Sequence, residues 1–141
     1  MKLPRIVITG SKGRLGKILT GSLSDSFDVY GLDIVGEQDE RNYRVDISNL
    51  EELDCVFKRI GPIKCVVHLA ADPRVEADWE SVLRNNIMGT RNLYECARKY
   101  GIRRVIFASS SHVTGAYEGF PPALHKQEDP PKISVNDPVL G

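Results

Sequence analysis

The chain has 141 residues, of which 41% are apolar and 27% are charged, and its 19 basic residues balance its 19 acidic ones. This length allows one domain with a buried core. The balanced charge excludes the basic field that nucleic acid or an anionic membrane would require. The sequence has no apolar run near the roughly 18–20 residues of a membrane span, and its N-terminus lacks the apolar core of a signal peptide. We therefore expect a cytoplasmic globular protein.

The three cysteines are odd in number and show no Cys-x-x-Cys spacing. Cys55, Cys65 and Cys96 each fall within an apolar pattern. Such a pattern favours buried reduced thiols over disulfides or metal ligands, so we expect no metal site. Reduced thiols also agree with a cytoplasmic location.

Short apolar segments alternate with helical patterns through the first 108 residues. Five segments have the character of strands, at residues 5–9, 28–33, 43–45, 64–69 and 103–108. Apolar residues at helical spacing predict a first helix after the first strand, and they are Leu15, Ile18, Leu19 and Leu23. The alternation predicts parallel strands joined by right-handed crossovers, and hence an α/β fold with a doubly wound parallel sheet of about five strands.

Two further helices are expected. Ser48 and Glu51 form a Ser-x-x-Glu capping box at the start of one helix, which Gly61 and Pro62 end. A long amphipathic helix is predicted over residues 79–100. Its apolar stripe comprises Leu83, Ile87, Tyr94 and Ala97, flanked by Val82, Leu93 and Cys96.

The pattern changes beyond residue 115. Five of the eight prolines lie between Pro121 and Pro138, in a stretch with no helical or alternating pattern. We therefore predict one domain over residues 1–115 and an irregular, proline-rich segment over residues 116–141, not a second domain.

A Gly-x-x-Gly-x-x-Gly segment joins the first strand to the first helix. The free N–H groups and positive end of that helix favour a pyrophosphate. Glycine lets a phosphate approach the backbone, and the third glycine lets the helix pack close to the strand. A tight turn in some other α/β protein is the alternative interpretation. The residues predicted to contact a cofactor here are Gly10, Lys12, Gly13, Arg14, Leu15 and Gly16.

Asp33 ends the second strand, 23 residues after Gly10. At this position an acid accepts hydrogen bonds from the ribose hydroxyls of an adenosine, and it would repel a 2′-phosphate. Lys12 and Arg14 are basic residues that could meet such a phosphate. A solvated turn residue is the alternative for Asp33. Together with the glycines, Asp33 predicts NAD rather than NADP.

The motifs and their order resemble the extended short-chain dehydrogenase/reductases, the NAD-dependent epimerase/dehydratase family. The matching segments are the glycine-rich loop and residues 45–47, 68–71, 86–90 and 109–115. The resemblance implies a Rossmann-type fold, NAD as cofactor, and a sugar or nucleotide-sugar as substrate. It also implies that Asp46 and Ile47 lie on the adenine side of the cofactor.

Residues 68–71 follow the fourth strand, at the sheet edge where such folds bind ligands. His68 is interpreted as a structural histidine. The alanines would let the backbone approach the cofactor, although the segment also fits strand core, and the predicted contacts are Leu69, Ala70 and Ala71. Asn86 is a poor helix former, which indicates a hydrogen bond either to the cofactor or to the backbone.

The serine run after the fifth strand is the candidate catalytic segment. A hydroxyl at a strand's carboxyl end can hold a substrate hydroxyl or carbonyl for proton transfer, and the resemblance places Ser110 on the family's catalytic serine or threonine. Residues 110–115 most resemble the hexuronate (uronate) dehydrogenases, which implies that Ser111 and His112 bind substrate. A polar strand end and a loop histidine are the alternatives.

The family's general base is a tyrosine in Tyr-x-x-x-Lys, and none of the five tyrosines here has a lysine four positions on. Without that base, hydride transfer should lose on the order of 10²–10⁴ in rate. We expect a naturally short or C-terminally truncated form that lacks the substrate lobe and is inactive, or nearly so, alone. Uncovered apolar surface on the fifth strand and the long helix would favour homo-oligomers.

The sequence leaves three alternative functions for this chain. The first is the NAD-binding portion of an NAD-dependent sugar oxidoreductase of the uronate dehydrogenase kind. The second, in the same enzyme class, is a nucleotide-sugar epimerase or dehydratase, which would recycle NAD. The third is a non-catalytic NAD-binding module, which the missing tyrosine and lysine allow.

Overall fold

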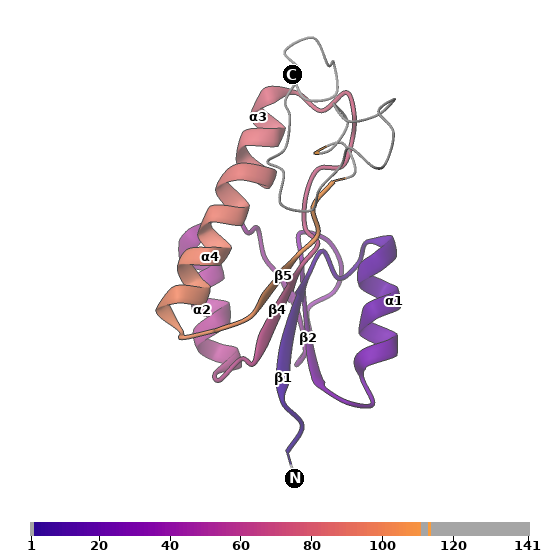
Figure 1. The fold of residues 1–141 in the computed structure, drawn as a ribbon, viewed down its shortest axis with the longest axis vertical. Coiled ribbons are helices and arrows are strands. Elements are labelled where there is room, and N and C mark those ends of the chain that lie inside the picture. The colour runs from indigo at the N-terminus through magenta and orange to yellow at the C-terminus, as the bar shows by residue number, and fades with distance from the viewer. Residues whose placement is uncertain (1, 111–112, 114–141) are drawn as a thin grey trace, which may run out of the picture. The chain divides into compact units, whose positions relative to one another are not determined.

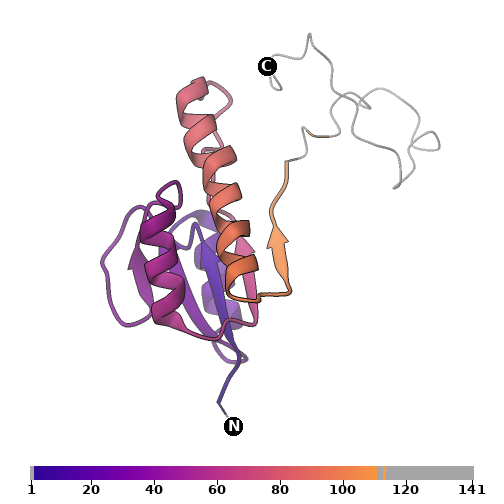
Figure 2. The same ribbon diagram turned by 90° about the vertical axis from the view of Figure 1, so that its left-hand side faces the viewer.

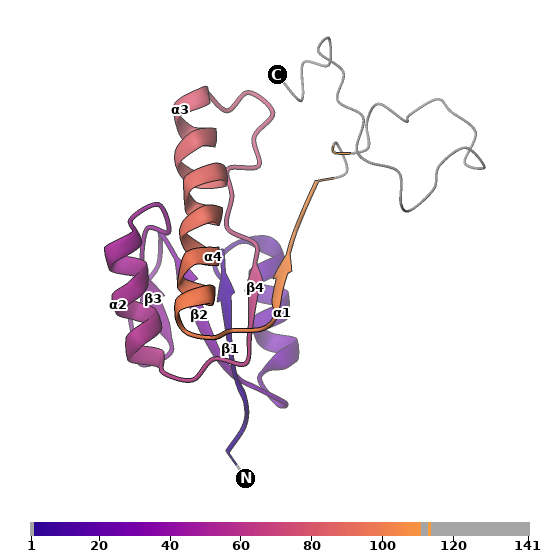
Figure 3. The ribbon, with the colours of Figure 1, turned by 60° about the vertical axis from the view of Figure 1, so that its left-hand side comes forward.

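A computed structural model describes residues 2–110 and residue 113, and the chain divides after Ala108 into two compact units. The first unit contains a sheet of five strands that pair in parallel in the order β3-β2-β1-β4-β5 (Figures 1 and 3). The strands are β1 (Arg5–Thr9), β2 (Asp28–Asp33), β3 (Asn42–Arg44), β4 (Cys65–His68) and β5 (Val105–Phe107).

The strand order reverses direction between β1 and β4. From β1 the chain moves outward through β2 to β3, and it then crosses to β4 on the other side of β1. In sheets of this type, ligands bind beyond the carboxyl ends of the strands at the point of reversal. Val7, Ile8 and Val66 on these two central strands are fully buried, as expected for strands covered on both faces.

Helices cover both faces of the sheet, which confirms the doubly wound α/β fold. Figure 1 shows α1 (Arg14–Leu23) on one face and α2 (Leu50–Ile60) with α4 (Gly89–Lys99) on the other. Leu53, Phe57 and Leu93 bring α2 and α4 into the larger core. On the opposite face, Leu19 and Leu23 of α1 pack against a smaller cluster around β1 and β4.

Helix α2 begins one residue later than the sequence pattern predicted. Asn49, not Ser48, is its N-cap: the Asn49 Oδ1 accepts from the N–H of Glu51 at 3.1 Å and of Glu52 at 3.2 Å. The predicted box of Ser48 with Glu51 is therefore wrong. Ser48 is unavailable because its hydroxyl donates to the Asp46 carboxylate at 2.7 Å. The helix ends at Gly61, as predicted, with φ of +82°.

The predicted long helix is present and contains a change of helical type. It runs through α3 (Trp79–Ser81), the π-helical segment η1 (Val82–Met88) and α4. The predicted apolar positions fall into a buried set and an exposed set. Leu93, Cys96 and Ala97 are buried against the sheet, whereas the side chains exposed to solvent are Leu83, Ile87 and Tyr94. The exposed side chains agree with the predicted uncovered apolar surface on the long helix.

The cysteines follow the prediction in part. Cys65 and Cys96 are buried, Cys55 is exposed, and all three are free thiols. Cys55 lies on α2 two residues after the core residue Leu53, and a rotation of about 200° carries it to the solvent side. The expectation that Cys55 is buried is therefore corrected.

Apolar side chains remain exposed at one edge of the sheet. Ile106 and Phe107 lie on β5, an edge strand that Figure 2 shows in orange beside the rest of the sheet, and both are about half exposed. This agrees with the predicted uncovered surface on the fifth strand. Over the part of the chain described here, none of the helices combines the length and apolar character needed to cross a lipid bilayer.

Candidate functional site

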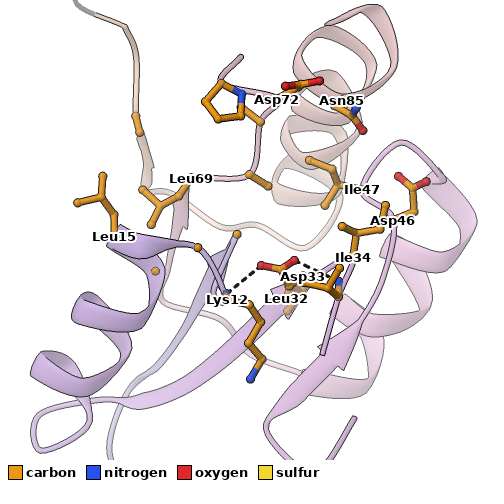
Figure 4. A pocket seen from close by; sticks show the side chains of 18 of the residues that line it. Lys12, Leu15, Leu32, Asp33, Ile34, Asp46, Ile47, Leu69, Asp72 and Asn85 are labelled. Atoms are coloured by element: carbon orange, nitrogen blue, oxygen red, sulfur yellow. Dashed lines mark hydrogen bonds between the residues drawn. The ribbon is translucent and has the colours of Figure 1, made fainter. Parts of the chain in front are cut away.

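A cleft with a volume of about 780 Å³ lies at the carboxyl ends of the strands, on the line of reversal between β1 and β4 (Figure 4). It brings together loops that are distant in sequence. Nearly all residues predicted to contact a cofactor line it, and these are Gly10, Lys12, Gly13, Arg14, Leu15, Gly16, Asp33, Asp46, Ile47, Leu69, Ala70 and Ala71. Asn86 does not line the cleft.

The three glycines of the first loop have different reasons for lacking a side chain. Gly10 has φ of +68°, and a Cβ there would lie 2.9 Å from the Ala70 nitrogen. A Cβ on Gly16 would lie 2.1 Å from the Gly10 carbonyl oxygen. Gly13 has ordinary dihedrals, and its Cβ would meet only the Gly10 oxygen at 3.2 Å. Folding therefore requires Gly10 and Gly16, whereas Gly13 leaves backbone bare in the wall of the cleft.

Asp33 is oriented into the cleft by two backbone groups (Figure 4). Its Oδ2 accepts from the Lys12 N–H at 2.8 Å, and its Oδ1 accepts from the Val35 N–H at 3.2 Å. The Lys12 ammonium does not pair with Asp33, because its Nζ donates to the Asn42 Oδ1 at 3.1 Å. These hydrogen bonds hold the Asp33 carboxylate beside the glycine loop, and the Lys12 ammonium forms no ion pair with it.

Asp46 is held on its inner side by neighbouring donors. Its Oδ1 accepts from the Ser48 N–H at 2.9 Å and from the Ser48 hydroxyl at 2.7 Å, and its Oδ2 pairs with the Arg84 guanidinium. Burial opposes ionisation of Asp46, but the hydrogen bonds from Ser48 and Arg84 outweigh it, so the pKa of Asp46 lies below its ordinary value. The carboxylate is charged at neutral pH.

Ile47 sets the approach of the long helix to this side of the cleft. A Cβ on Gly89 would lie 2.7 Å from two carbons of the Ile47 side chain. Asn92, one turn further along α4, donates from Nδ2 to the carbonyls of Ile47 at 3.1 Å and Ser48 at 2.8 Å. Gly89, within the 86–90 motif, therefore allows α4 to pack closely against the loop that follows β3.

A buried hydrogen-bonded chain joins β1, β4 and α4 beneath the cleft. The Thr9 hydroxyl oxygen accepts from the N–H groups of Leu69 and Ala70, both at 3.2 Å, and lies 2.7 Å from the His68 Nδ1. The His68 Nε2 lies 3.0 Å from the Thr90 hydroxyl. Because the Thr9 oxygen already accepts twice, we assign its proton to the bond with Nδ1, which makes His68 the neutral tautomer with hydrogen on Nε2.

Burial lowers the pKa of His68 to about 4. The hydrogen-bond pattern agrees, since a charged ring would have to donate from Nδ1 to an oxygen with no free lone pair. The interpretation of His68 as a structural histidine is consistent with this environment.

Two neighbouring asparagines of the long helix make different contacts. Asn86 binds the backbone of Asp72 twice: its Oδ1 accepts from the N–H at 2.7 Å, and its Nδ2 donates to the carbonyl at 3.1 Å. Asn85 lines the cleft instead, with its Nδ2 donating to the Ser81 hydroxyl at 3.1 Å. Of the two possibilities left open by the sequence, Asn86 contacts the backbone.

Several residues that line the cleft were missed by the sequence analysis. They include Asp72, Pro73, Arg74, Ser81, Asn85 and Ala108. Asp72 to Arg74 directly follow a predicted site segment, so their position after β4 was the available signal. Ser81 and Asn85 are four residues apart and share one face of the long helix, but nothing local to the sequence shows that this face borders the cleft.

The predicted catalytic and substrate-binding residues belong to the second unit or fall outside the description. Ser110 is described but lies beyond Ala108, where the first unit ends. Ser111 and His112 lie outside the described residues. Their assigned roles stay predictions.

The fold and the cleft define a dinucleotide-binding type of α/β protein. A strand, a glycine-rich loop and a helix N-terminus meet an acid at the end of β2, at the reversal point of a parallel sheet. Residues 6–137 match the NAD dependent epimerase/dehydratase family. The chain belongs to that family.

Curated relatives include two sugar dehydrogenases. The chain is 37% identical to the NAD-dependent glucose-6-phosphate dehydrogenase of Haloferax volcanii, over 80% of this chain and 45% of that protein. It is 33% identical to the uronate dehydrogenase of Pseudomonas syringae pv. tomato, over 81% of this chain and 42% of that protein. The chain thus spans less than half the length of these relatives.

Solved structures give the same picture. A crystal structure of a mutant uronate dehydrogenase from Agrobacterium tumefaciens, complexed with NAD, matches with a TM-score of 0.70 and 28% identity, over 79% of this chain and 42% of that one. A crystal structure of UDP-galactose 4-epimerase matches with a TM-score of 0.74 and 28% identity, over 91% of this chain and 44% of that one. These matches confirm the Rossmann-type fold.

The low pKa of His68 makes stability fall in mild acid. The unfolded chain takes up the proton near the ordinary pKa of 6.5, and the folded chain does so only near 4. The contribution of His68 to the free energy of unfolding is therefore full above pH 6.5 and is lost as the pH falls toward 4. The free energy of unfolding should fall by about 2 kcal/mol between pH 7.5 and 5. Denaturant unfolding across this range should show the loss, and His68→Gln should remove that part of the slope. An NMR titration placing the ring's pKa near 6.5 would contradict the assignment.

Proposed function

We propose that this chain is the NAD-binding portion of an NAD-dependent sugar oxidoreductase of the uronate dehydrogenase kind. The observation that carries the proposal is the convergence of the glycine-rich loop, Asp33, Asp46 and the backbone after β4 on one cleft. The chain's membership of a family defined by NAD dependence supports the choice of cofactor.

The residues around the glycine loop fit a pyrophosphate. Helix α1 begins after Gly13, and no side chain among the described residues caps its first turn. The N–H groups of that turn, the positive helix end and the bare Gly13 backbone favour a diphosphate. The bound cofactor would supply the hydride acceptor. The chain's own groups bind it and exclude water from it.

Two acids would recognise the adenosine half of the cofactor. In this proposal Asp33 accepts hydrogen bonds from the ribose hydroxyls, and Asp46 with Ile47 borders the adenine. Ala70 and Ala71 form a wall without long side chains, against which the remainder of the cofactor lies. We propose Asn85, which the structure brings to the cleft, as a further contact in place of Asn86.

Chemistry on the sugar would involve the segment after β5. By resemblance, Ser110 holds the reacting hydroxyl, and Ser111 and His112 bind the substrate. An epimerase or dehydratase is the alternative within the enzyme class, since UDP-galactose 4-epimerase is among the similar structures. A third candidate, of another class, is a module that binds NAD without turnover, which the residues present allow. The three free thiols fit a reducing compartment such as the cytoplasm.

The bare backbone at Gly13 should matter for NAD and little for folding. We expect Gly13→Ala to weaken NAD binding at least 10-fold in calorimetry, because a Cβ would hold the phosphate away from the helix N-terminus. The loss of stability should be less than about 1 kcal/mol, since the new Cβ meets one carbonyl at 3.2 Å.

Gly21→Ala is the matched control for that variant. Gly21 lies within α1, and a Cβ there would meet nothing within 4 Å. The substitution should raise stability by about 0.5–1 kcal/mol and leave NAD affinity unchanged. If Gly13→Ala bound NAD as tightly as Gly21→Ala does, the proposed phosphate site would be wrong.

Asp33 should decide between the two dinucleotides. Asp33→Asn keeps a side-chain oxygen for the backbone but removes the charge that repels a 2′-phosphate. We expect the ratio of NAD to NADP affinity to fall about 10-fold, measured by titration of each cofactor. Asp25→Asn, at an exposed position, changes the charge equally and should leave the ratio unchanged. An unaltered ratio in Asp33→Asn would remove Asp33 from the proposed ribose site.

The 141 residues alone should turn over slowly. Because no tyrosine here has a lysine four positions on, proton removal lacks the family's base, and the rate should be about 10²–10⁴ below that of a full-length relative. The measurement is NADH absorbance with glucose 6-phosphate, glucuronate or galacturonate and NAD. Turnover equal to that of the relative would show that another group acts as base.

A further inference from the structure

The loop after β4 presents a guanidinium at the wall of the cleft. Arg74 lines the cleft, and 66% of its side chain is exposed. Its Nε donates to the Asp72 Oδ1 at 2.9 Å and its Nη2 to the Asp72 Oδ2 at 2.6 Å. A bidentate pair of this kind fixes the plane of the guanidinium as well as its position.

Asp72 is anchored independently of Arg74. Only 8% of its side chain is exposed, and the Ser81 hydroxyl donates to its Oδ2 at 2.5 Å. Its backbone is held on both sides by Asn86. The hydrogen bonds from Arg74 and Ser81 keep the pKa of Asp72 well below its usual range. The pair is therefore ionised and tied to the long helix.

The pair can offer only donors to a ligand. Each Asp72 oxygen already accepts twice: Oδ1 from the N–H and Nε of Arg74, and Oδ2 from its Nη2 and from Ser81. Arg74 has five side-chain N–H groups, of which Asp72 takes two. For the remaining three, no acceptor is recorded within residues 2–110. The outer edge of the guanidinium thus suits a ligand rich in lone pairs and negative charge.

The other basic groups of the cleft lie beside the glycine loop. Lys12 donates to Asn42, and Arg14 is in the first turn of α1. Arg74 follows β4, on the other side of β1 from β2 and β3, whose ends carry Asp33 and Asp46. Arg74 therefore lies on the opposite side of β1 from the strands proposed to hold the adenosine.

We propose that Arg74, oriented by Asp72, binds the anionic group of the sugar substrate, a phosphate or a carboxylate. This inference rests on the proposed function, because it assigns a substrate feature to the same cleft. Both groups present two oxygens to a planar guanidinium edge. Arg74 is then a specificity-determining residue that favours acidic sugars over neutral ones.

The test is an NMR titration of the 141-residue chain that follows the Arg74 Nε–H resonance. Glucose 6-phosphate, glucuronate and glucose are added separately, each with and without saturating NAD. We expect at least one acidic sugar to shift this resonance and to bind at least 10-fold more tightly than glucose. A larger effect of glucose 6-phosphate identifies a phosphate site, and a larger effect of glucuronate identifies a carboxylate site.

Arg74→Gln should abolish the preference for acidic sugars while changing NAD affinity less than 2-fold. Arg91→Gln is the control, because Arg91 is an exposed arginine of α4 away from the cleft lining, and it should behave as wild type. Equal affinity for all three sugars, no binding of any of them, or loss of NAD binding in Arg74→Gln would each overturn the proposal. Failure of the unaltered chain to bind NAD would instead count against the proposed function, since the titrations without cofactor test Arg74 separately.

Discussion

The close contact between the loop after β1 and the loop after β4 is the constraint on which the cleft depends. Gly10 lies where a Cβ would be 2.9 Å from the Ala70 nitrogen, and the Thr9 hydroxyl accepts the N–H groups of Leu69 and Ala70. The two loops follow β1 and β4, between which the strand order of the sheet reverses, so their contact forms the floor of the cleft. A neutral, buried His68 completes the network and links it to Thr90 on the long helix.

The acids around the cleft share one feature. Asp33, Asp46 and Asp72 are each held by neighbouring N–H or hydroxyl donors before any ligand arrives. Orientation by the protein lowers the entropy lost when a ligand binds, because these side chains are already ordered. The carboxylates differ in their capacity to accept further hydrogen bonds. Asp33 retains acceptor capacity for hydroxyl groups, whereas Asp72 is saturated and exposes the donors of Arg74 instead.

The long helix contributes to the site through its change of helical type. In the π-helical segment Asn86 holds the loop after β4, and Asn85 reaches the cleft. Beyond it, Gly89 allows Ile47 to approach, and Asn92 binds the adjoining backbone. One helix thereby fixes two loops that belong to opposite sides of the cleft. The NAD-binding proposal thus depends on this helix as much as on the glycine loop.

The sequence by itself determined the elements whose signals are local. The alternation of strands and helices, the glycine loop and Asp33 at the end of β2 follow from patterns within a few residues, because backbone dihedrals and solvent exposure impose them. Tertiary structure decided choices between neighbours: Asn49 over Ser48 as the cap, since the Ser48 hydroxyl also accepts from Arg84, and Asn85 over Asn86 at the cleft. It also placed the local pair of Asp72 and Arg74 at the cleft, where Asn86 holds the Asp72 backbone. Adjacent residues have nearly equal local propensities, so partners distant in the chain determine which of them faces the site.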